Sequence, residues 1–229
     1  MMKKCTFILV AILLLSFAQS AGAQHRVGIL GGLNFTKIDI EVQGESATVS
    51  SRTLFGIGGI LDVRVSQSLR LCLQPMYLQK GVGKTRLAIQ PGVEWMAKSS
   101  YLELPLLVKA EFGNTAKPYV LAGPSVGVLL RSELEAQMGG ITFTGDAKDV
   151  TKSLDFAVVF GAGISFPFGK NLVFIEGRYS LGLTDTVAGG TFDISAGPVV
   201  EEITWDEQTD MIKNRGFQIM AGVAFALGD

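Results

Sequence analysis

The sequence predicts an all-β protein, an eight-stranded antiparallel up-and-down transmembrane β-barrel. Three observations predict it. Bulky apolar residues alternate with small or polar ones in eight segments, each apolar face spans about 9–11 residues, and short connections alternate with long ones along the chain. A strand of that length crosses a bilayer when it is tilted. With 48% apolar and only 18% charged residues, the composition excludes a disordered chain.

The N-terminal segment is expected to be removed before the barrel forms. Lys3 and Lys4 precede an apolar run from Thr6 to Ala18, and the small residues that end at Ala23 fit a cleavage site. The run is shorter than the roughly 20 residues of a membrane-spanning helix. We therefore predict a signal peptide over 1–23, export through the Sec pathway, and a mature barrel domain over 24–229.

The first four strands are predicted over 27–35, 55–65, 69–80 and 102–112. In each of them, most alternate residues are bulky and apolar, as expected for a strand with one apolar face. These positions are Val27, Ile29, Leu33 and Phe35; Phe55, Ile57, Leu61, Val63 and Val65; Leu69, Leu71, Leu73 and Tyr77; and Leu102, Leu104, Leu106, Val108 and Phe112.

The last four strands are predicted over 120–131, 155–166, 173–184 and 217–227 on the same grounds. The final one is the most regular, because its apolar positions continue without interruption from Phe217 to Leu227, with small or polar residues between them. Glycine occurs on the opposite face of six of the eight strands, all except 69–80 and 102–112, where side chains would crowd the inside of a narrow barrel.

The connections alternate in length. Short turns are predicted near residues 67, 114 and 169, and long loops near 41–52, 88–98, 134–151 and 187–213. Outer-membrane barrels have short turns on the periplasmic side and long loops outside. Aromatic residues of the apolar face also gather near both ends of the strands, as they do at membrane interfaces. These residues are Phe35, Phe55, Tyr77, Phe156, Tyr179 and Phe217 near the long loops, and Phe112, Phe166, Phe168 and Phe225 near the short turns.

A soluble calycin-like barrel is the alternative fold, with an apolar ligand cavity and a polar exterior. The face with most glycine carries few charges and would make a poor soluble exterior. The sequence therefore favours the membrane barrel.

The inward positions carry charges of both signs. Eight strands enclose a space that side chains nearly fill, and opposite charges inside it are expected to pair. The predicted lumen charge network comprises Arg26, Asp62, Arg64, Arg70, Lys80, Glu103, Lys109, Glu111, Asp155, Glu176 and Arg178. Glycines on that face either make room for these side chains or curve the strands, and both interpretations stay open. We expect a closed lumen.

The fourth long loop is the best candidate for a binding surface. It is long and rich in acids, and long loops in compact domains are often functional. Its segment 199–205 has a strand-like pattern, so either a hairpin above the membrane or a loop fits the sequence. The candidate partner-binding residues are Asp193, Glu201, Glu202, Trp205, Asp206, Glu207 and Asp210.

Several classes of chemistry have no support in the sequence. A net charge of −1 gives no basic surface for nucleic acid. The single histidine, His25, falls at the periplasmic start of the first strand, and Cys72 has no histidine partner nearby in sequence. We predict no enzyme activity, no metal site and no cofactor.

Four segments resemble the PorT-like family of small outer-membrane β-barrel proteins. They are YLELPLLVK at 101–109, KPYVLAGPSVG at 117–127, EGRYSLGL at 176–183 and GILGGLNF at 28–35. The resemblance implies a Gram-negative outer-membrane barrel that the barrel-assembly machinery inserts, and it implies no catalytic residue. Some members resemble a component of type IX secretion.

Three functions follow as expectations. The first is a non-enzymatic integral outer-membrane protein whose loops form an interaction surface or support the cell envelope. The second is an accessory component of a protein-secretion complex. The third is a small-solute transporter. The expected partners are outer-membrane lipid, the barrel-assembly machinery, and a secretion-complex or surface protein.

Overall fold

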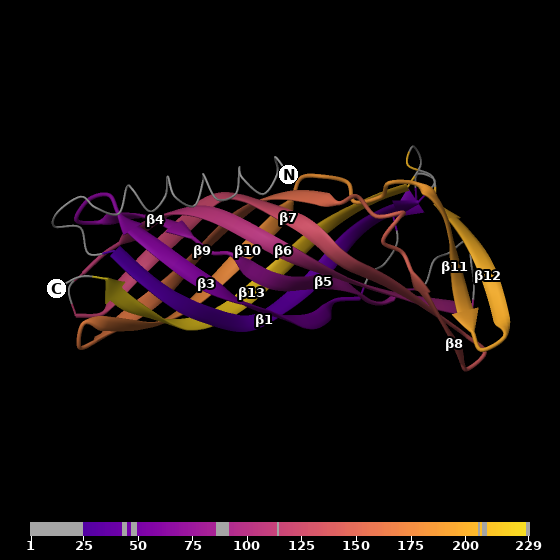
Figure 1. The fold of residues 1–229 in the computed structure, drawn as a ribbon, viewed down its shortest axis with the longest axis horizontal. Helices are drawn as coiled ribbons and strands as arrows, with labels where there is room; N and C mark the ends of the chain where they lie inside the picture. The colour runs from indigo at the N-terminus through magenta and orange to yellow at the C-terminus, as the bar shows by residue number, and fades with distance from the viewer. Residues whose placement is uncertain are drawn as a thin grey trace, which may run out of the picture.

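The computed structural model describes residues 25–42, 45–46, 50–85, 92–113, 115–205, 207 and 210–227. The predicted signal peptide lies outside these residues. The described chain forms antiparallel strands that run between two ends of an elongated molecule (Figure 1). The strands are β1 (His25–Val42), β2 (Glu45–Ser46), β3 (Arg52–Arg64), β4 (Leu69–Leu73), β5 (Met76–Thr85), β6 (Val93–Glu111), β7 (Lys117–Met138), β8 (Ile141–Asp146), β9 (Leu154–Phe168), β10 (Asn171–Gly182), β11 (Gly190–Ala196), β12 (Val199–Trp205) and β13 (Asp210–Leu227).

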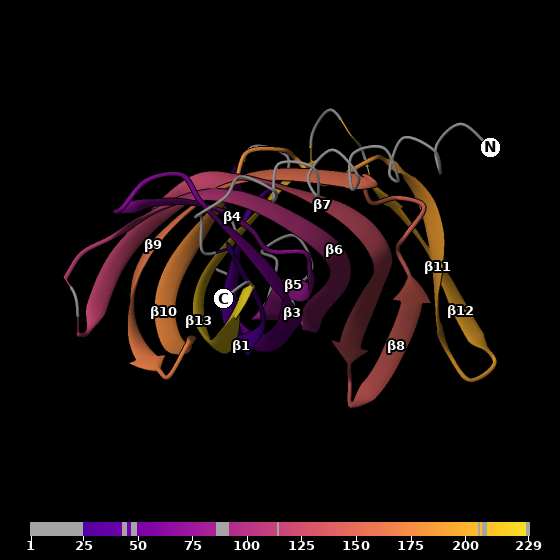
Figure 2. The ribbon, with the colours of Figure 1, turned by 60° about the vertical axis from the view of Figure 1, so that its left-hand side comes forward.

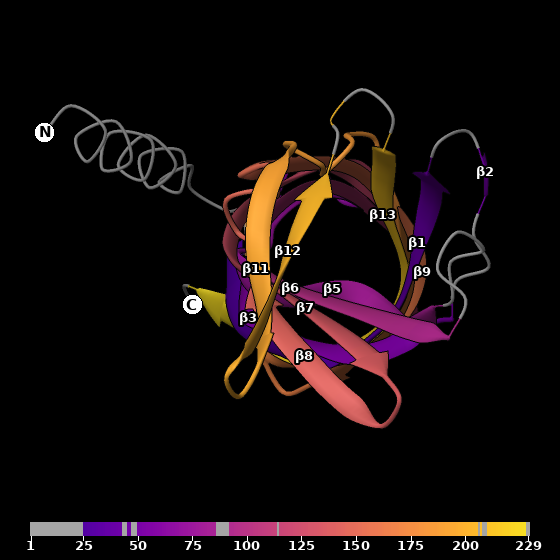
Figure 3. The same ribbon diagram turned by 90° about the vertical axis from the view of Figure 1, so that its right-hand side faces the viewer.

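The strands close into a ring, which Figure 3 shows end-on. β1 pairs with β3 on one side and with β13 on the other, so the first and last strands join. Between them, β4 and β5 together fill one position between β3 and β6, and β7, β9 and β10 complete the circle. The predicted eight-stranded antiparallel barrel is confirmed.

The strand predicted over 69–80 is interrupted where it contains a proline. Pro75 has no N–H to donate, and β4 ends at Leu73 before it. The neighbouring groups are satisfied across the break, because the Gln74 N–H donates to the Pro105 carbonyl at 3.1 Å and the Gly59 N–H donates to the Pro75 carbonyl at 2.9 Å. The barrel wall therefore continues through the interruption.

The barrel is polar inside and apolar outside. Inward charged side chains such as Asp62 and Arg178 are almost fully buried, whereas outward residues such as Ile29 and Phe168 are 65% and 75% exposed. This polarity is that of a barrel in lipid and the reverse of the calycin alternative. Near the long-loop end, the aromatic residues Phe55 and Tyr77 pack with ring centroids 5.7 Å apart.

A β-bulge separates the barrel from a sheet that extends beyond it. Tyr101 pairs with Leu129 but Ser100 pairs with Arg131, so Leu130 is an extra residue in β7. One extra residue exchanges the two faces of a strand. Arg131, which the simple alternation places inside, consequently lies outside, and Leu134 turns inward to a second core.

The extension is a sheet with its own hydrophobic cluster, at the end of the molecule where β8, β11 and β12 are labelled (Figures 1 and 2). β8 pairs with the outer half of β7, β11 contacts β8 through Ser195 and Thr144, and β12 pairs with β11. The cluster consists of Leu134, Ala136, Phe143, Ala147, Val150, Phe192 and Ile194. The segments 88–98, 134–151 and 187–213 were predicted as loops, but each contains strand residues. These strands fold because they bury their apolar side chains against one another in the hydrophobic cluster.

The 199–205 segment forms one arm of a hairpin, which resolves the two alternatives left by the sequence. Ala196 pairs with Val199, so Gly197 and Pro198 form a two-residue turn. Gly197 has φ of 60°, as the first position of a type II′ turn requires, and proline fits the second. No helix among the described residues is long and apolar enough to span a membrane.

Candidate functional site

Three groups of charged side chains lie in the lumen, together with a cluster of buried apolar residues that includes Leu30, Leu121 and Met220. The first lies near the short turns and is centred on Glu111, whose carboxylate accepts hydrogen bonds from Arg26 at 3.4 Å and from Arg70 at 3.2 Å. The Lys109 ammonium lies 3.5 Å from Glu111 and 3.2 Å from Asp62. These five residues come from β1, β3, β4 and β6, so the group ties four strands together.

The second group spans the lumen at Arg178. Its guanidinium donates to Gln218 on the neighbouring β13 and to Gln74 across the barrel, both at 2.5 Å, and it lies 3.4 Å from Glu176. The Tyr119 hydroxyl donates to the other oxygen of Glu176 at 2.8 Å. The Arg178 side chain therefore links two opposite walls of the lumen.

The third group lies toward the outer sheet and is centred on Lys80. Its ammonium lies between the carboxylates of Glu103 and Asp155, at 2.8 Å from Asp155. Asp155 also accepts hydrogen bonds from Asn214 at 2.9 Å and from Thr184 at 3.0 Å. One cation is therefore shared by two buried acids.

The predicted network is thus divided into three groups, and Arg64 stands apart from them. Arg64 is half-buried at the end of β3, where its guanidinium donates to the Ser66 carbonyl at 3.1 Å. The predicted network did not include the uncharged members, which are Gln74, Tyr119, Thr184, Asn214 and Gln218. The sequence could have indicated them, because each lies on or near a predicted strand. A polar side chain that points into the lumen needs a hydrogen-bond partner there.

Glycines opposite the large inward side chains make the packing possible. A Cβ atom at Gly163 would lie 2.5 Å from the Tyr119 ring, and one at Gly222 would lie 2.5 Å from the Phe174 ring. Both distances are far below a normal carbon–carbon contact. These glycines therefore provide space. Between Lys80, Asn214 and Gln218 lies a cavity of about 10 Å³, the size of one water molecule.

The outer sheet carries acids on the face opposite its hydrophobic cluster. Asp193 on β11 lies directly across from Glu202 on β12, and both are exposed. The register that pairs Ser195 with Thr144 brings Asp146 beside Asp193 on the same face. Like charges in adjacent positions of a sheet repel. The arrangement is therefore suited to a cationic partner.

The other candidate residues of this region have different roles. Glu201 lies across from Ile194, and Trp205 packs edge-on against Phe192 with ring centroids 5.4 Å apart, so the indole belongs to the cluster. Asp210 is the first residue of β13, and Asp206 lies outside the described residues.

Glu207 fixes the end of the hairpin. Its carboxylate lies 3.0 Å from the Lys152 ammonium, which also contacts Asp185 at 3.3 Å. The hydrogen bond to Glu207, together with the charge of Asp185, raises the pKa of Lys152 above its usual value.

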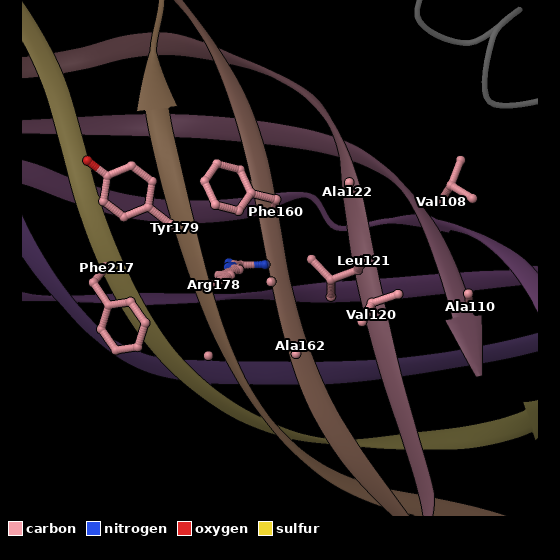
Figure 4. A pocket seen from close by; sticks show the side chains of 12 residues that line it. Val108, Ala110, Val120, Leu121, Ala122, Phe160, Ala162, Arg178, Tyr179 and Phe217 are labelled. Carbon is pink, nitrogen blue, oxygen red and sulfur yellow. The ribbon is translucent and has the colours of Figure 1, made fainter. Parts of the chain in front are cut away.

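The outer wall of the barrel has an apolar groove of about 620 Å³. Figure 4 shows Phe160, Tyr179 and Phe217 toward one end of it and Val108 and Ala110 at the other. Small residues of β7, β9 and β10 form its floor. The groove faces outward, where the wall is apolar and lipid chains surround a membrane barrel.

Among the described residues, no group of three or more His, Cys, Asp and Glu side chains is placed to hold a metal ion. Cys72 is buried and accepts a hydrogen bond from the Gln74 amide at 3.3 Å. It lies in the wall of the filled lumen and does not face solvent.

Comparisons with known proteins agree with this architecture. The structure is similar to the outer membrane protein OprG from Pseudomonas aeruginosa, with a TM-score of 0.54 and 11% identity over 90% of this chain and 97% of that one. It is also similar to a major outer membrane protein from Thermus thermophilus, with a TM-score of 0.53 and 8% identity over 89% of this chain and 99% of that one. A search of curated proteins found no match.

Residues 17–188 match the sequence model of a family described as outer membrane protein beta-barrel domain. The match covers most of the chain, and the closed, inside-polar barrel is what such a domain requires. The chain belongs to this outer membrane protein beta-barrel family.

Proposed function

We propose that the protein is a non-enzymatic membrane anchor with a closed lumen, and that its outer sheet is a surface for a protein partner. The observation that carries the proposal is the division of the molecule into two cores. The barrel lumen is filled by buried ion pairs together with a hydrophobic cluster of inward side chains, and a separate hydrophobic cluster stabilises a sheet beyond the barrel. A sheet that only connected two strands would need no core of its own.

The orientation follows from the connections. The short turns belong to the periplasmic side and the outer sheet to the cell surface, as in other barrels with both ends in the periplasm. Sec export of a precursor with a 1–23 signal peptide and insertion by the barrel-assembly machinery complete this proposal. Lipid is the partner of the outward wall, and its acyl chains fit the apolar groove.

Two measurements test the anchor. The protein in purified outer membranes should migrate at different apparent masses before and after boiling, as a folded barrel does. The refolded protein should give no steady conductance at porin level in planar bilayers, because Arg178 bridges the lumen. Open-channel conductance would refute the closed lumen.

An accessory role in a secretion complex of the type IX kind is the second candidate. The resemblance of the four segments on β1, β6, β7 and β10 to the PorT-like family favours it, since some members of that family resemble a component of type IX secretion. Chemical crosslinking in native membranes followed by purification should recover a defined complex if this role is correct, and an isolated barrel if it is not. Transport of a small solute is disfavoured, because the lumen is packed with buried side chains.

A further inference from the structure

The outer sheet ends in a strand with a free edge. β12 is the terminal strand of the sheet order, and β11 is its sole pairing partner within the described part of the chain. Figures 1 and 2 both show β12 on the side of the extension that points away from the barrel. An open strand edge is a template for pairing with another chain.

The hairpin geometry identifies the free groups. The pair next to a two-residue turn is hydrogen-bonded, so Ala196 and Val199 bond each other and every second pair after them does the same. The intervening residues of β12, Val200, Glu202 and Thr204, therefore direct their N–H and C=O groups away from β11. These three residues are exposed, and their spacing matches the pattern that an added antiparallel strand requires.

The charges beside this edge select the partner. Asp146, Asp193 and Glu202 follow one another across three strands on one face, and the row ends at the free edge. No ion pair to these three acids occurs among the described residues, whereas the nearby Glu133 is already paired with Arg131 at 2.7 Å. A neighbouring strand with Lys or Arg on this face would extend the row with the opposite charge.

The same charges disfavour other occupants. Two copies of β12 paired antiparallel about Glu202, the central residue of the strand, would place the Glu202 carboxylate of one chain against that of the other, and these like charges repel. Anionic lipid headgroups are repelled for the same reason. We propose that the free edge of β12 binds an extended, basic segment of a partner protein, which adds to the outer sheet as a further strand. This inference rests on the proposed function and specifies its partner.

The test uses the refolded full-length protein in a neutral detergent and two dye-labelled peptides. The first peptide has Lys at alternate positions with Val and Thr between them, and the second has Glu in place of Lys. Fluorescence anisotropy should show binding of the Lys peptide and not of the Glu peptide. Binding should weaken as salt is added, because exposed charges are screened.

Two variants separate strand addition from simple charge attraction. Thr204→Pro removes an N–H that faces the free edge and leaves the backbone hydrogen bonds to β11 in place, so it should weaken Lys-peptide binding at least about tenfold. It also removes the side-chain hydrogen bond between Thr204 and Thr191 at 3.1 Å, so Thr204→Val, which loses that bond and keeps the N–H, is the control and should bind the Lys peptide as the unchanged protein does. Glu202→Lys should reduce Lys-peptide binding and create binding of the Glu peptide. Unchanged fluorescence of Trp95 and Trp205, which pack against the second cluster, shows that the sheet remains folded.

Lys-peptide binding that Thr204→Pro leaves intact would overturn the proposal, as would the absence of binding. Either result, in a protein that still shows heat-modifiable migration and no conductance, would leave the membrane anchor standing and remove only this partner.

Discussion

Replacement of Lys80 by methionine tests whether the lumen is a desolvated, paired core. Lys80 is the one cation between Glu103 and Asp155, and the side chains of these two acids are 2% and 0% exposed. In Lys80→Met, two buried carboxylates would remain with no cation between them. Breaking a buried pair in this way costs about 3–5 kcal/mol, or a factor of roughly 10²–10⁴ in the unfolding equilibrium.

The assay is urea unfolding of the refolded protein in lipid vesicles, followed by the loss of heat-modifiable migration. Lys84→Met is the matched control, because Lys84 lies on the same strand and pairs with Glu94 at 2.8 Å, but its side chain is 57% exposed. Exposed pairs contribute about 0–1 kcal/mol. Adding Glu103→Gln to Lys80→Met should recover part of the loss. A Lys80→Met protein as stable as the Lys84→Met protein would refute the claim that the charges of the lumen are buried and paired.

Three further predictions concern the glycine positions, the second cluster and the hairpin end. Gly163→Leu should displace the Tyr119 ring and lower the free energy of unfolding by about 1–3 kcal/mol, whereas Gly31→Ala, whose Cβ would be 3.5 Å from its nearest neighbour, should have little effect in the same urea assay. Ile194→Ala, at a site 2% exposed, should destabilise the outer sheet by about 2–4 kcal/mol, seen as an earlier change in tryptophan fluorescence, while the heat-modifiable shift of the barrel persists. The ion pairs of Lys152 should be fully present below pH about 10.5 and be lost as the pH rises through the raised pKa, and their loss should change the tryptophan fluorescence of the outer sheet. Lys152→Ala, which lacks these ion pairs at every pH, should abolish this change at alkaline pH.

The barrel was predictable because lipid and a narrow lumen impose a strict period of two on each strand. Leu102, Glu103 and Leu104 alternate between apolar and charged, so the sequence alone indicates which side of the strand each side chain occupies. No knowledge of contacts distant in sequence is needed. The interruption at Pro75 could also have been expected, since proline cannot donate to a ladder.

The outer sheet was not predictable from alternation alone. The Leu130 bulge exchanges the faces of β7, and nothing in its local sequence marks the extra residue. Beyond the bulge, strands from three separate segments bury each other's apolar faces. Their stability depends on pairings such as Ser195 with Thr144, which are remote in sequence. The division of the lumen charges into three groups likewise depends on strand register and stagger.

The placement of the outer sheet on the cell surface is the central claim, and cysteine labelling tests it most directly. The buried Cys72 should not react, so Ser195→Cys in the outer sheet and Gln67→Cys in a short turn can each carry the reporter thiol. A membrane-impermeant maleimide should label the Ser195→Cys protein on intact cells, and the Gln67→Cys protein only after the outer membrane is permeabilised. Labelling of Gln67→Cys on intact cells, with Ser195→Cys protected, would contradict the account.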